Sequence, residues 1–257
     1  MGLVAWAQQA FHKTGSPRWF FLGSRRWMVG LYAAGIALIV AGSTIGLGFV
    51  PPERFQGDSF RILFVHVPAV HLAQAIYVAV AVAGLVYLVW RMKMADMVIA
   101  AAAPVGMAVT AAGLATGVVW GMPTWGTGWV WDARIISTLV LLLLFFGLLA
   151  LRQAIPRPDR AAMAVSLLAV VGVVNLPIIK YSVEWFTTLH QPASLTLGER
   201  PTIAPVFLVP LALNALGYYC LAAGIVIAAL RMKIIERESG TSWVADWLAG
   251  HKERVGG

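Results

Sequence analysis

The stretch that decides the fold is IISTLVLLLLFFGLLALR, at residues 135–152, which has no acidic residue and no base before its last position. A run of about 20 apolar residues is long enough to cross a bilayer as a helix. Five more such runs flank it, at residues 27–50, 64–90, 97–120, 161–181 and 204–230. The sequence therefore predicts an all-α, polytopic membrane protein, with residues 1–257 forming a single integral membrane domain and a bundle of six transmembrane helices.

The composition of the whole chain agrees with this fold. Hydrophobic residues make up 60% of the 257 residues and charged residues 12%, and the mean hydropathy of +0.80 is far above that of a soluble domain. Asp, Glu, Lys and Arg occur in the six runs only at their ends, which argues against an ion-coupled transporter. The chain has no G-x-x-x-x-G-K-[ST] phosphate loop, so we expect any ATP hydrolysis to be carried out by a partner.

The distribution of basic residues predicts the orientation. Of the 19 Lys and Arg residues, all but five lie in the tails and in the loops on the same side as the tails. The five on the other side are Arg54, Arg61, Arg134, Lys180 and Arg200. Because positive residues are retained on the cytoplasmic side, both termini are predicted to be cytoplasmic. The net charge of +8 then predicts contact with membrane lipid, not with nucleic acid.

Two aromatic segments on this cytoplasmic side, residues 3–22 and 243–247, are expected to lie in the membrane interface.

A tryptophan-rich outer loop, residues 121–134, precedes the decisive run and contains WGTGWVWDAR. The two glycines of this stretch, Gly126 and Gly128, disfavour a regular helix. In an extended chain, side chains two residues apart point to the same side, so the indoles would form a flat aromatic shelf. The three tryptophans are Trp125, Trp129 and Trp131. The alternative is an interfacial belt, because tryptophan is enriched at both membrane surfaces.

Two charged residues, Asp132 and Arg134, lie at the end of this loop, and each has two interpretations. Asp132 is either the N-cap of the next helix or part of a binding site, and the two roles are compatible. Arg134 is either a helix-end cation among lipid headgroups or a group that holds a carboxylate with two hydrogen bonds.

Three histidines lie outside the cytoplasmic tails. His66 stands just before a proline suited to the first turn of a helix, and so at the outer rim of the second span. His190 lies in the last outer loop, so the two flank the tryptophan-rich loop in sequence. His71 is five residues beyond His66, which is about 140° further round a helix. We therefore expect His71 to be a packing or pore-lining residue and not a ligand.

Two neutral imidazoles, a flat aromatic surface and nearby arginines suit haem. Its iron takes axial imidazoles, its ring stacks on aromatic faces and its propionates pair with arginine. The candidate propionate partners are Arg61, Arg134 and Arg54. A zinc site would need three or four closely spaced ligands, which these loops do not offer. The combination favours His66 and His190 as metal ligands.

The chain resembles the haem exporter protein C family, the C component of the bacterial cytochrome c maturation pathway. The resemblance covers nearly the whole chain: the six spans, QGDSFRILFVHVPA at residues 56–69, WGTGWVWDAR at 125–134 and YSVEWFTTLHQ at 181–191. Six spans with one histidine before the tryptophan-rich loop and one after it are specific to this component. One position departs from the family pattern, because Gly128 stands where a further tryptophan is usual.

The resemblance implies that His66 and His190 are the axial ligands of a transiently bound haem b. It implies that the loop around Trp125, Trp129, Trp131 and Asp132 holds this haem at the periplasmic face of the bacterial inner membrane. The protein would be a scaffold and not an enzyme, and would deliver haem to a periplasmic haem chaperone. Its other partners would be an ATPase subunit, a second membrane subunit and a small single-span subunit of an ABC-type complex.

Three other functions remain open at this point. A membrane permease would conduct haem or another apolar substrate across the bilayer. A bis-histidine redox cytochrome usually has its histidines within the spans, whereas here they lie at one edge. A structural subunit would only dock other chains.

Overall fold

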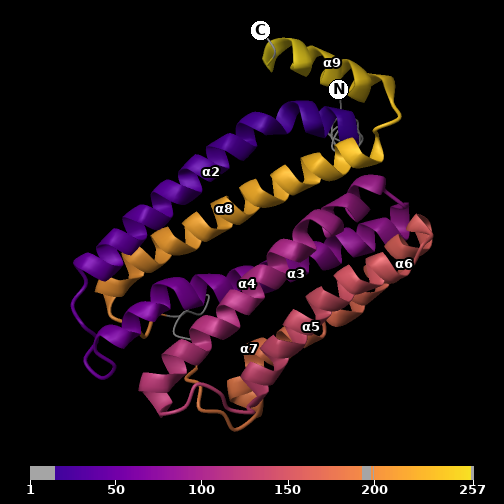
Figure 1. Ribbon diagram of the computed structural model, residues 1–257. Helices are drawn as coiled ribbons and strands as arrows, with labels where there is room; N and C mark the ends of the chain where they lie inside the picture. The colour runs from indigo at the N-terminus through magenta and orange to yellow at the C-terminus, as the bar shows by residue number, and fades with distance from the viewer. Residues whose placement is uncertain (1–14, 193–197, 199, 256–257) are drawn as a thin grey trace.

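The computed structural model describes residues 15–192, 198 and 200–255, and Figure 1 shows their arrangement. The elements are α2 (Pro17–Gly48), the 3-10 helix η1 (Asp58–Ile62), α3 (Leu63–Trp90), α4 (Lys93–Trp125), α5 (Ala133–Ala154), α6 (Pro158–Gly172), α7 (Asn175–Trp185), α8 (Pro205–Arg237) and α9 (Ser242–Val255). Six helical segments are long and apolar enough to cross a membrane. The predicted all-α fold with six spans is confirmed.

The helices extend beyond the apolar runs. Helix α2 begins at Pro17, ten residues before the predicted run, because Ser16 caps it by accepting a bond from the Trp19 N–H at 3.5 Å. Helix α4 continues to Trp125, so the loop predicted from residue 121 begins at Gly126 instead. Gly126 ends α4 with a positive φ of 73°, a conformation that favours glycine. Capping interactions, and not hydropathy, therefore decide where α2 begins and where α4 ends.

The fifth span is broken, although the sequence predicts one run over residues 161–181. Helix α6 ends at Gly172 and α7 begins at Asn175. Pro177 has no N–H to donate to the carbonyl of Val173, and its ring disfavours a continuous helix. The side-chain amide of Asn175 donates to the backbone carbonyl of Ser137 at 2.8 Å, which fastens the break to α5.

Figure 1 shows α2 and α8 lying side by side as one pair, α3 and α4 in the middle, and α5, α6 and α7 on the far side. Glycine allows the α2–α8 pair to approach closely, since a Cβ on Gly35 would lie 2.7 Å from the backbone nitrogen of Leu221. The core between the other helices includes Tyr77 and Phe145, whose rings meet edge to face at 5.1 Å.

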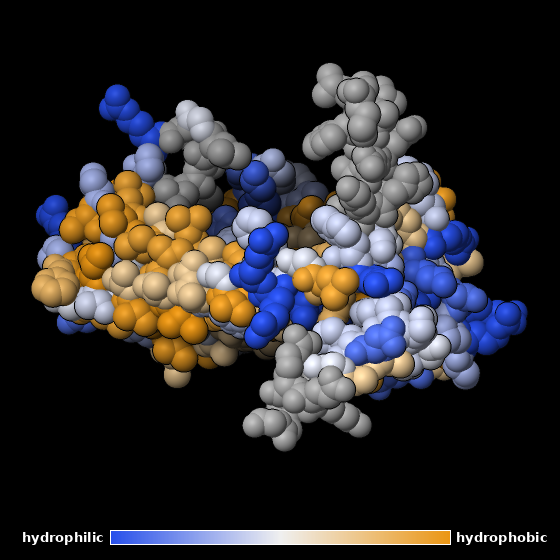
Figure 2. All heavy atoms as spheres, turned by 90° about the horizontal axis from the view of Figure 1, so that it is seen from above, coloured by the Kyte–Doolittle hydropathy of each residue, from blue (hydrophilic) through white to orange (hydrophobic). Residues whose placement is uncertain are grey.

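The surface is largely apolar. Figure 2 shows apolar side chains over one part of the molecule and polar residues gathered at another. Large hydrophobic side chains are exposed on most of the membrane-length helices, among them Val40, Val82, Phe146, Val171 and Val209. An exposed apolar surface on this scale is typical of a protein that contacts lipid, so the chain is a multi-pass membrane protein.

An ion-pair cluster closes the end of the bundle at which α4 begins. Asp96 accepts from Arg152 at 2.7 Å and from Arg237 at 2.9 Å, and so joins α4, α5 and α8. The Asp96 side chain is 7% exposed.

The described parts of the two aromatic segments predicted for the membrane interface lie near this end. Residues 3–14 of the first lie outside the described residues, and residues 17–22 belong to α2. In the second, Trp243 and Trp247 of α9 pack against Phe21 of α2, with ring centroids 5.7 and 5.0 Å apart. These two indoles therefore contact protein and do not face lipid alone.

Candidate functional site

His66 lies in the first turn of α3 and faces α4. Its Nδ1 is 3.1 Å from the carbonyl oxygen of Gly113 and 3.1 Å from the hydroxyl of Thr116. Since a carbonyl only accepts, Nδ1 carries the proton, and Nε2 keeps a lone pair. A Cβ on Gly117 would lie 3.1 Å from the His66 Cε1, so glycine at 117 gives the imidazole room beside α4.

His190 lies in the segment after α7 and is held by Asp132. Its Nδ1 is 2.8 Å from Oδ2 of Asp132. Oδ1 of the same carboxylate accepts from the backbone N–H of Ile135 at 2.9 Å and so caps α5. The Thr188 hydroxyl bonds to the Asp132 carboxylate and accepts the backbone N–H of His190 at 3.1 Å. Asp132 thus caps α5 as predicted and also contacts His190, while its role in a binding site stays a prediction.

The protonation states favour a neutral imidazole beside an ionised carboxylate. Burial lowers the pKa of His190 below its usual value, against the opposing effect of Asp132. Burial alone would raise the pKa of Asp132, but hydrogen bonds from Ile135, Thr188 and His190 bring it below its usual value. Near neutral pH the Nε2 of His190 therefore has a free lone pair.

Two tryptophans of α4 connect the histidines. The ring of Trp120 meets His66 edge to face at 5.6 Å, and Trp125 meets His190 at 4.8 Å. The two histidines also lie within electrostatic range of each other. The end of α4 therefore forms a wall that both imidazoles touch.

Trp120 was not among the predicted site residues, because it ends the apolar run 97–120 and reads as part of a span. The signal that could have found it is the pair of indoles five residues apart at one helix end. Its Nε1 donates to the side-chain oxygen of Gln56 at 2.7 Å, which ties the first outer loop to α4.

The predicted flat shelf of three indoles is wrong. Trp125 is still helical, while Trp129 and Trp131 follow the left-handed turn at Gly126. The rings of Trp129 and Trp131 are 5.4 Å apart and nearly perpendicular, at 79°. Trp131 is 72% exposed, whereas the Nε1 of Trp129 is buried and has no hydrogen-bond partner within the described part of the chain.

Gly128 is where the loop folds back on α4. A Cβ at this position would lie 2.8 Å from Cγ1 of Val118 and 3.0 Å from its carbonyl oxygen. The close approach of two backbones explains a glycine at this position.

The predicted arginines occupy different places. Arg134 donates to the hydroxyl of Ser182 at 3.0 Å and to the carbonyl of Gln191 at 3.3 Å, so it lies beside the His190 segment. Arg61 instead donates to the carbonyls of Gly46 and Leu47 at the end of α2, at 2.6 and 2.8 Å.

The remaining candidates lie at the surface. Arg54 is exposed, with its guanidinium 5.5 Å from the centre of the Phe55 ring. His71 is exposed on α3, so the prediction that it packs within the bundle is wrong, while the alternative that it lines a pore stays a prediction.

The donor set suits haem better than a zinc ion. Among the residues that the structure describes, no group of three or more His, Cys, Asp or Glu could hold a metal ion. Each imidazole has its Nδ1 on an acceptor, so Nε2 is the nitrogen that would be available to a haem iron. The unpaired indole N–H of Trp129 and the guanidinium of Arg134 provide donors for acidic groups.

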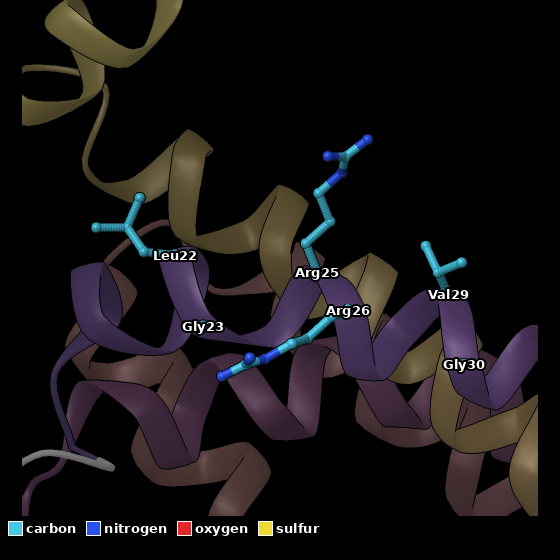
Figure 3. A pocket seen from close by; sticks show the side chains of 6 residues that line it. All are labelled: Leu22, Gly23, Arg25, Arg26, Val29 and Gly30. Atoms are coloured by element: carbon cyan, nitrogen blue, oxygen red, sulfur yellow. The ribbon is translucent and has the colours of Figure 1, made fainter.

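Figure 3 shows a hollow elsewhere, along one face of α2, lined by Leu22, Gly23, Arg25, Arg26, Val29 and Gly30. These residues belong to the start of α2, at the end of the bundle near α9, whereas the tryptophan-rich loop lies at the other end (Figure 1). The hollow is therefore separate from the histidine site.

The fold and the site define a class: a six-span helical membrane protein that presents two neutral imidazoles beside tryptophans at one end of its bundle. The sequence model of heme exporter protein C matches residues 10–245. The chain belongs to the heme exporter protein C family.

Relatives of the same name cover most of the chain. Heme exporter protein C of Escherichia coli (strain K12) is 42% identical over 218 residues, which are 85% of this chain and 88% of the relative. The protein of that name from Haemophilus influenzae is 42% identical over 209 residues, 81% of this chain and 85% of the relative. The protein of that name from Bradyrhizobium diazoefficiens is 40% identical over 222 residues, which are 86% of this chain and 84% of the relative.

Proposed function

We propose that this protein holds haem transiently between His66 and His190 and delivers it to a periplasmic haem chaperone during cytochrome c maturation. The observation that carries the proposal is the pair of imidazoles that each have Nδ1 on an acceptor, at 3.1 Å for His66 and 2.8 Å for His190. Each is then left with Nε2 for iron. The name of the relatives, heme exporter protein C, supports haem as the cargo.

The residues around the two ligands have separate tasks in this proposal. Trp120 and Trp125 hold the imidazoles in place by edge contacts. Arg134 pairs with a propionate, and Trp129 and Trp131 contribute an aromatic surface. Haem supplies the iron and the planar ring, and the chain supplies orientation. We propose no nucleophile, acid or base, so the protein is a carrier and not an enzyme.

The orientation follows from the charge distribution and the shape of the bundle. The start of α2 and helix α9 lie at one end of the molecule, and the tryptophan-rich loop lies at the opposite end (Figure 1). With basic residues concentrated near the first end, we propose that this end is cytoplasmic and that the histidine site faces the periplasm of a bacterial inner membrane. The missing phosphate loop fits an ABC-type complex with an ATPase subunit, a second membrane subunit and a small single-span subunit.

The test is the visible spectrum of haem bound to the full chain, purified with its partner subunits. The variants His66→Ala and His190→Ala should each lose the bis-imidazole spectrum, because each removes one axial ligand. The matched control is His71→Ala, which removes an exposed imidazole five residues from His66 and should leave the spectrum unchanged. A bis-imidazole spectrum that survives in both site variants would refute the ligand assignment.

Chaperone loading is measured in the same preparations. Haem that stays bound but fails to reach the chaperone in a Trp129→Ala, Trp131→Ala double variant would assign these two indoles to delivery. Haem uptake into sealed vesicles that contain this chain alone would instead support a permease.

A further inference from the structure

The Asp132 carboxylate serves two different groups with its two oxygens. Oδ1 caps α5 through the Ile135 N–H at 2.9 Å, and Oδ2 faces the Nδ1 of His190 at 2.8 Å. The side chain of Asp132 is 4% exposed and that of His190 20%, so water competes little for either bond. The cap needs only Oδ1, which leaves the second oxygen for the imidazole.

Capping alone does not explain an aspartate here. Asparagine is about as good an N-cap as aspartate, and it costs less to bury because it carries no charge. A carboxylate accepts hydrogen bonds on both of its oxygens, whereas the asparagine amide has one acceptor oxygen and one donor NH₂. The second acceptor points at a histidine, so the charge of Asp132 acts on His190.

The proton positions follow from counting donors. The Thr188 hydroxyl has one proton, which it donates to the Asp132 carboxylate, while its oxygen accepts the backbone N–H of His190. An ionised carboxylate has no proton to give. The Nδ1 of His190 must therefore carry a hydrogen, because otherwise two acceptors would face each other at 2.8 Å.

His66 has a weaker counterpart to this arrangement. Its Nδ1 faces a neutral carbonyl, that of Gly113, at 3.1 Å, and the Thr116 hydroxyl at the same distance. Hydrogen bonds to an ionised acceptor are about twice as strong as those between neutral groups. A carboxylate on Nδ1 also raises the basicity of the metal-binding nitrogen.

We propose that Asp132 is a positioning residue that makes the two axial ligands unequal, with His190 the stronger and His66 the weaker. It does so by fixing the Nδ1–H tautomer of His190 and by increasing the electron density on Nε2. The inference rests on the proposed function, in which both histidines bind haem iron. An unequal pair suits a carrier that must release its cargo, because one bond breaks first while the other still holds the haem.

The first experiment uses the haem-free protein, so that its result does not depend on haem binding. In Asp132→Asn the cap can remain on Oδ1, while an amide replaces Oδ2 and presents a donor to Nδ1. Nitrogen NMR of ¹⁵N-histidine-labelled protein in nanodiscs should show His190 changing from the Nδ1–H to the Nε2–H tautomer. Asp159→Asn, the same change in the first turn of α6, should leave the His190 signals unchanged.

The second experiment uses the haem-loaded complex. Asp132→Asn should lower haem affinity by about 10- to 100-fold, as loss of a partner of a metal-binding histidine typically does, and should raise the midpoint potential. Thr188→Val keeps the Asp132 carboxylate on His190, so it should change both quantities less than Asp132→Asn does. An unchanged His190 tautomer together with an unchanged potential would overturn the proposal.

The remaining outcomes are also decisive. If the wild type fails to bind haem, the proposed function is refuted, while the NMR result still decides whether Asp132 fixes the tautomer. If Asp132→Asn does not fold, Asp132→Ser replaces it, because serine keeps an N-cap acceptor and removes the carboxylate from His190. His190→Ala should lower haem affinity more than His66→Ala, and the reverse order would contradict the inequality.

Discussion

The indole of Trp125, the last residue of α4, lies edge-on against the imidazole of His190, with ring centroids 4.8 Å apart at 69°. His190 belongs to a segment without regular structure, and its other fixed contacts are with Asp132 and Thr188. The end of α4 therefore supports an imidazole whose own segment has no regular structure.

The first prediction follows from this contact. Trp125→Ala should weaken haem binding by about 2- to 10-fold, which corresponds to the 0.5–1.5 kcal/mol of an aromatic pair. Trp125→Phe should recover part of the loss, because a smaller ring can still meet the imidazole edge. Titration of haem followed by absorbance measures the change.

The control for Trp125 is Trp185→Ala. Trp185 is exposed on α7, where it stacks on Tyr181 at 5.3 Å. If Trp125→Ala and Trp185→Ala lose the same haem affinity, the loss does not come from the contact between Trp125 and His190.

The second prediction concerns Gly128. Gly128→Ala should destabilise the protein by about 1–3 kcal/mol, as overpacking does, because the new methyl would lie 2.8 Å from Cγ1 of Val118. Val118→Ala removes that methyl partner and should restore part of the stability in the double variant. Thermal unfolding in detergent measures both. If the single variant is as stable as the wild type, the loop does not pack on α4 in the way described.

Hydropathy predicted most of the fold but only part of the site. The six apolar runs were sufficient to place His66 at the rim of a span and His190 in an outer loop. They could not show that α4 runs on to Trp125, because the end of that helix depends on a left-handed turn at Gly126. That extra turn brings Trp125 to His190 and removes it from the expected aromatic shelf.

Tertiary contacts account for the other differences. The pairing of Asp132 with His190 joins residues 58 positions apart, and no local pattern encodes such a contact. Arg61 was expected near a propionate because of its position beside His66 in sequence. Its guanidinium donates to the carbonyls of Gly46 and Leu47 at the end of α2, and its pairing with a propionate stays a prediction.

The third prediction is a dependence of haem ligation on pH. A neutral imidazole is required for iron binding, and burial lowers the pKa of His190 below the usual value of 6.5. A lowered pKa means that the neutral form persists to more acidic pH than in free imidazole. Haem binding should therefore begin to weaken at a more acidic pH than an imidazole with the usual pKa of 6.5 would give, and titration of haem at several pH values measures this.

The folded state responds to pH in the same direction. Because the pKa of His190 is lower in the folded chain than in the unfolded chain, its contribution to stability is present above the unfolded value and declines as pH falls below it. Asp132, whose pKa is also lowered, loses its contribution at still lower pH. Hydrogen exchange of residues 186–191 at several pH values, expressed as protection relative to the intrinsic exchange rate at each pH, measures this, and protection that increases on acidification would contradict the prediction.

The fourth prediction separates stability from haem binding. Asp96 is the shared acceptor of Arg152 and Arg237 at the end of the bundle away from the histidines. Asp96→Asn leaves both guanidinium groups without a carboxylate. The cost should be about 3 kcal/mol, the lower end for a broken buried pair, because the two arginine side chains are 26% and 32% exposed.

The haem spectrum of Asp96→Asn should match that of the wild type at temperatures where the variant is folded, because Asp96 joins α4, α5 and α8 far from the end of α4 that touches both imidazoles. Asp159→Asn, which changes an exposed carboxylate, should affect neither the unfolding temperature nor the spectrum. Thermal unfolding and haem absorbance, recorded on the same samples, compare the two. Loss of the bis-imidazole spectrum from folded Asp96→Asn would show that the two ends of α4 are coupled, so that an event at the proposed cytoplasmic end could release haem at the other.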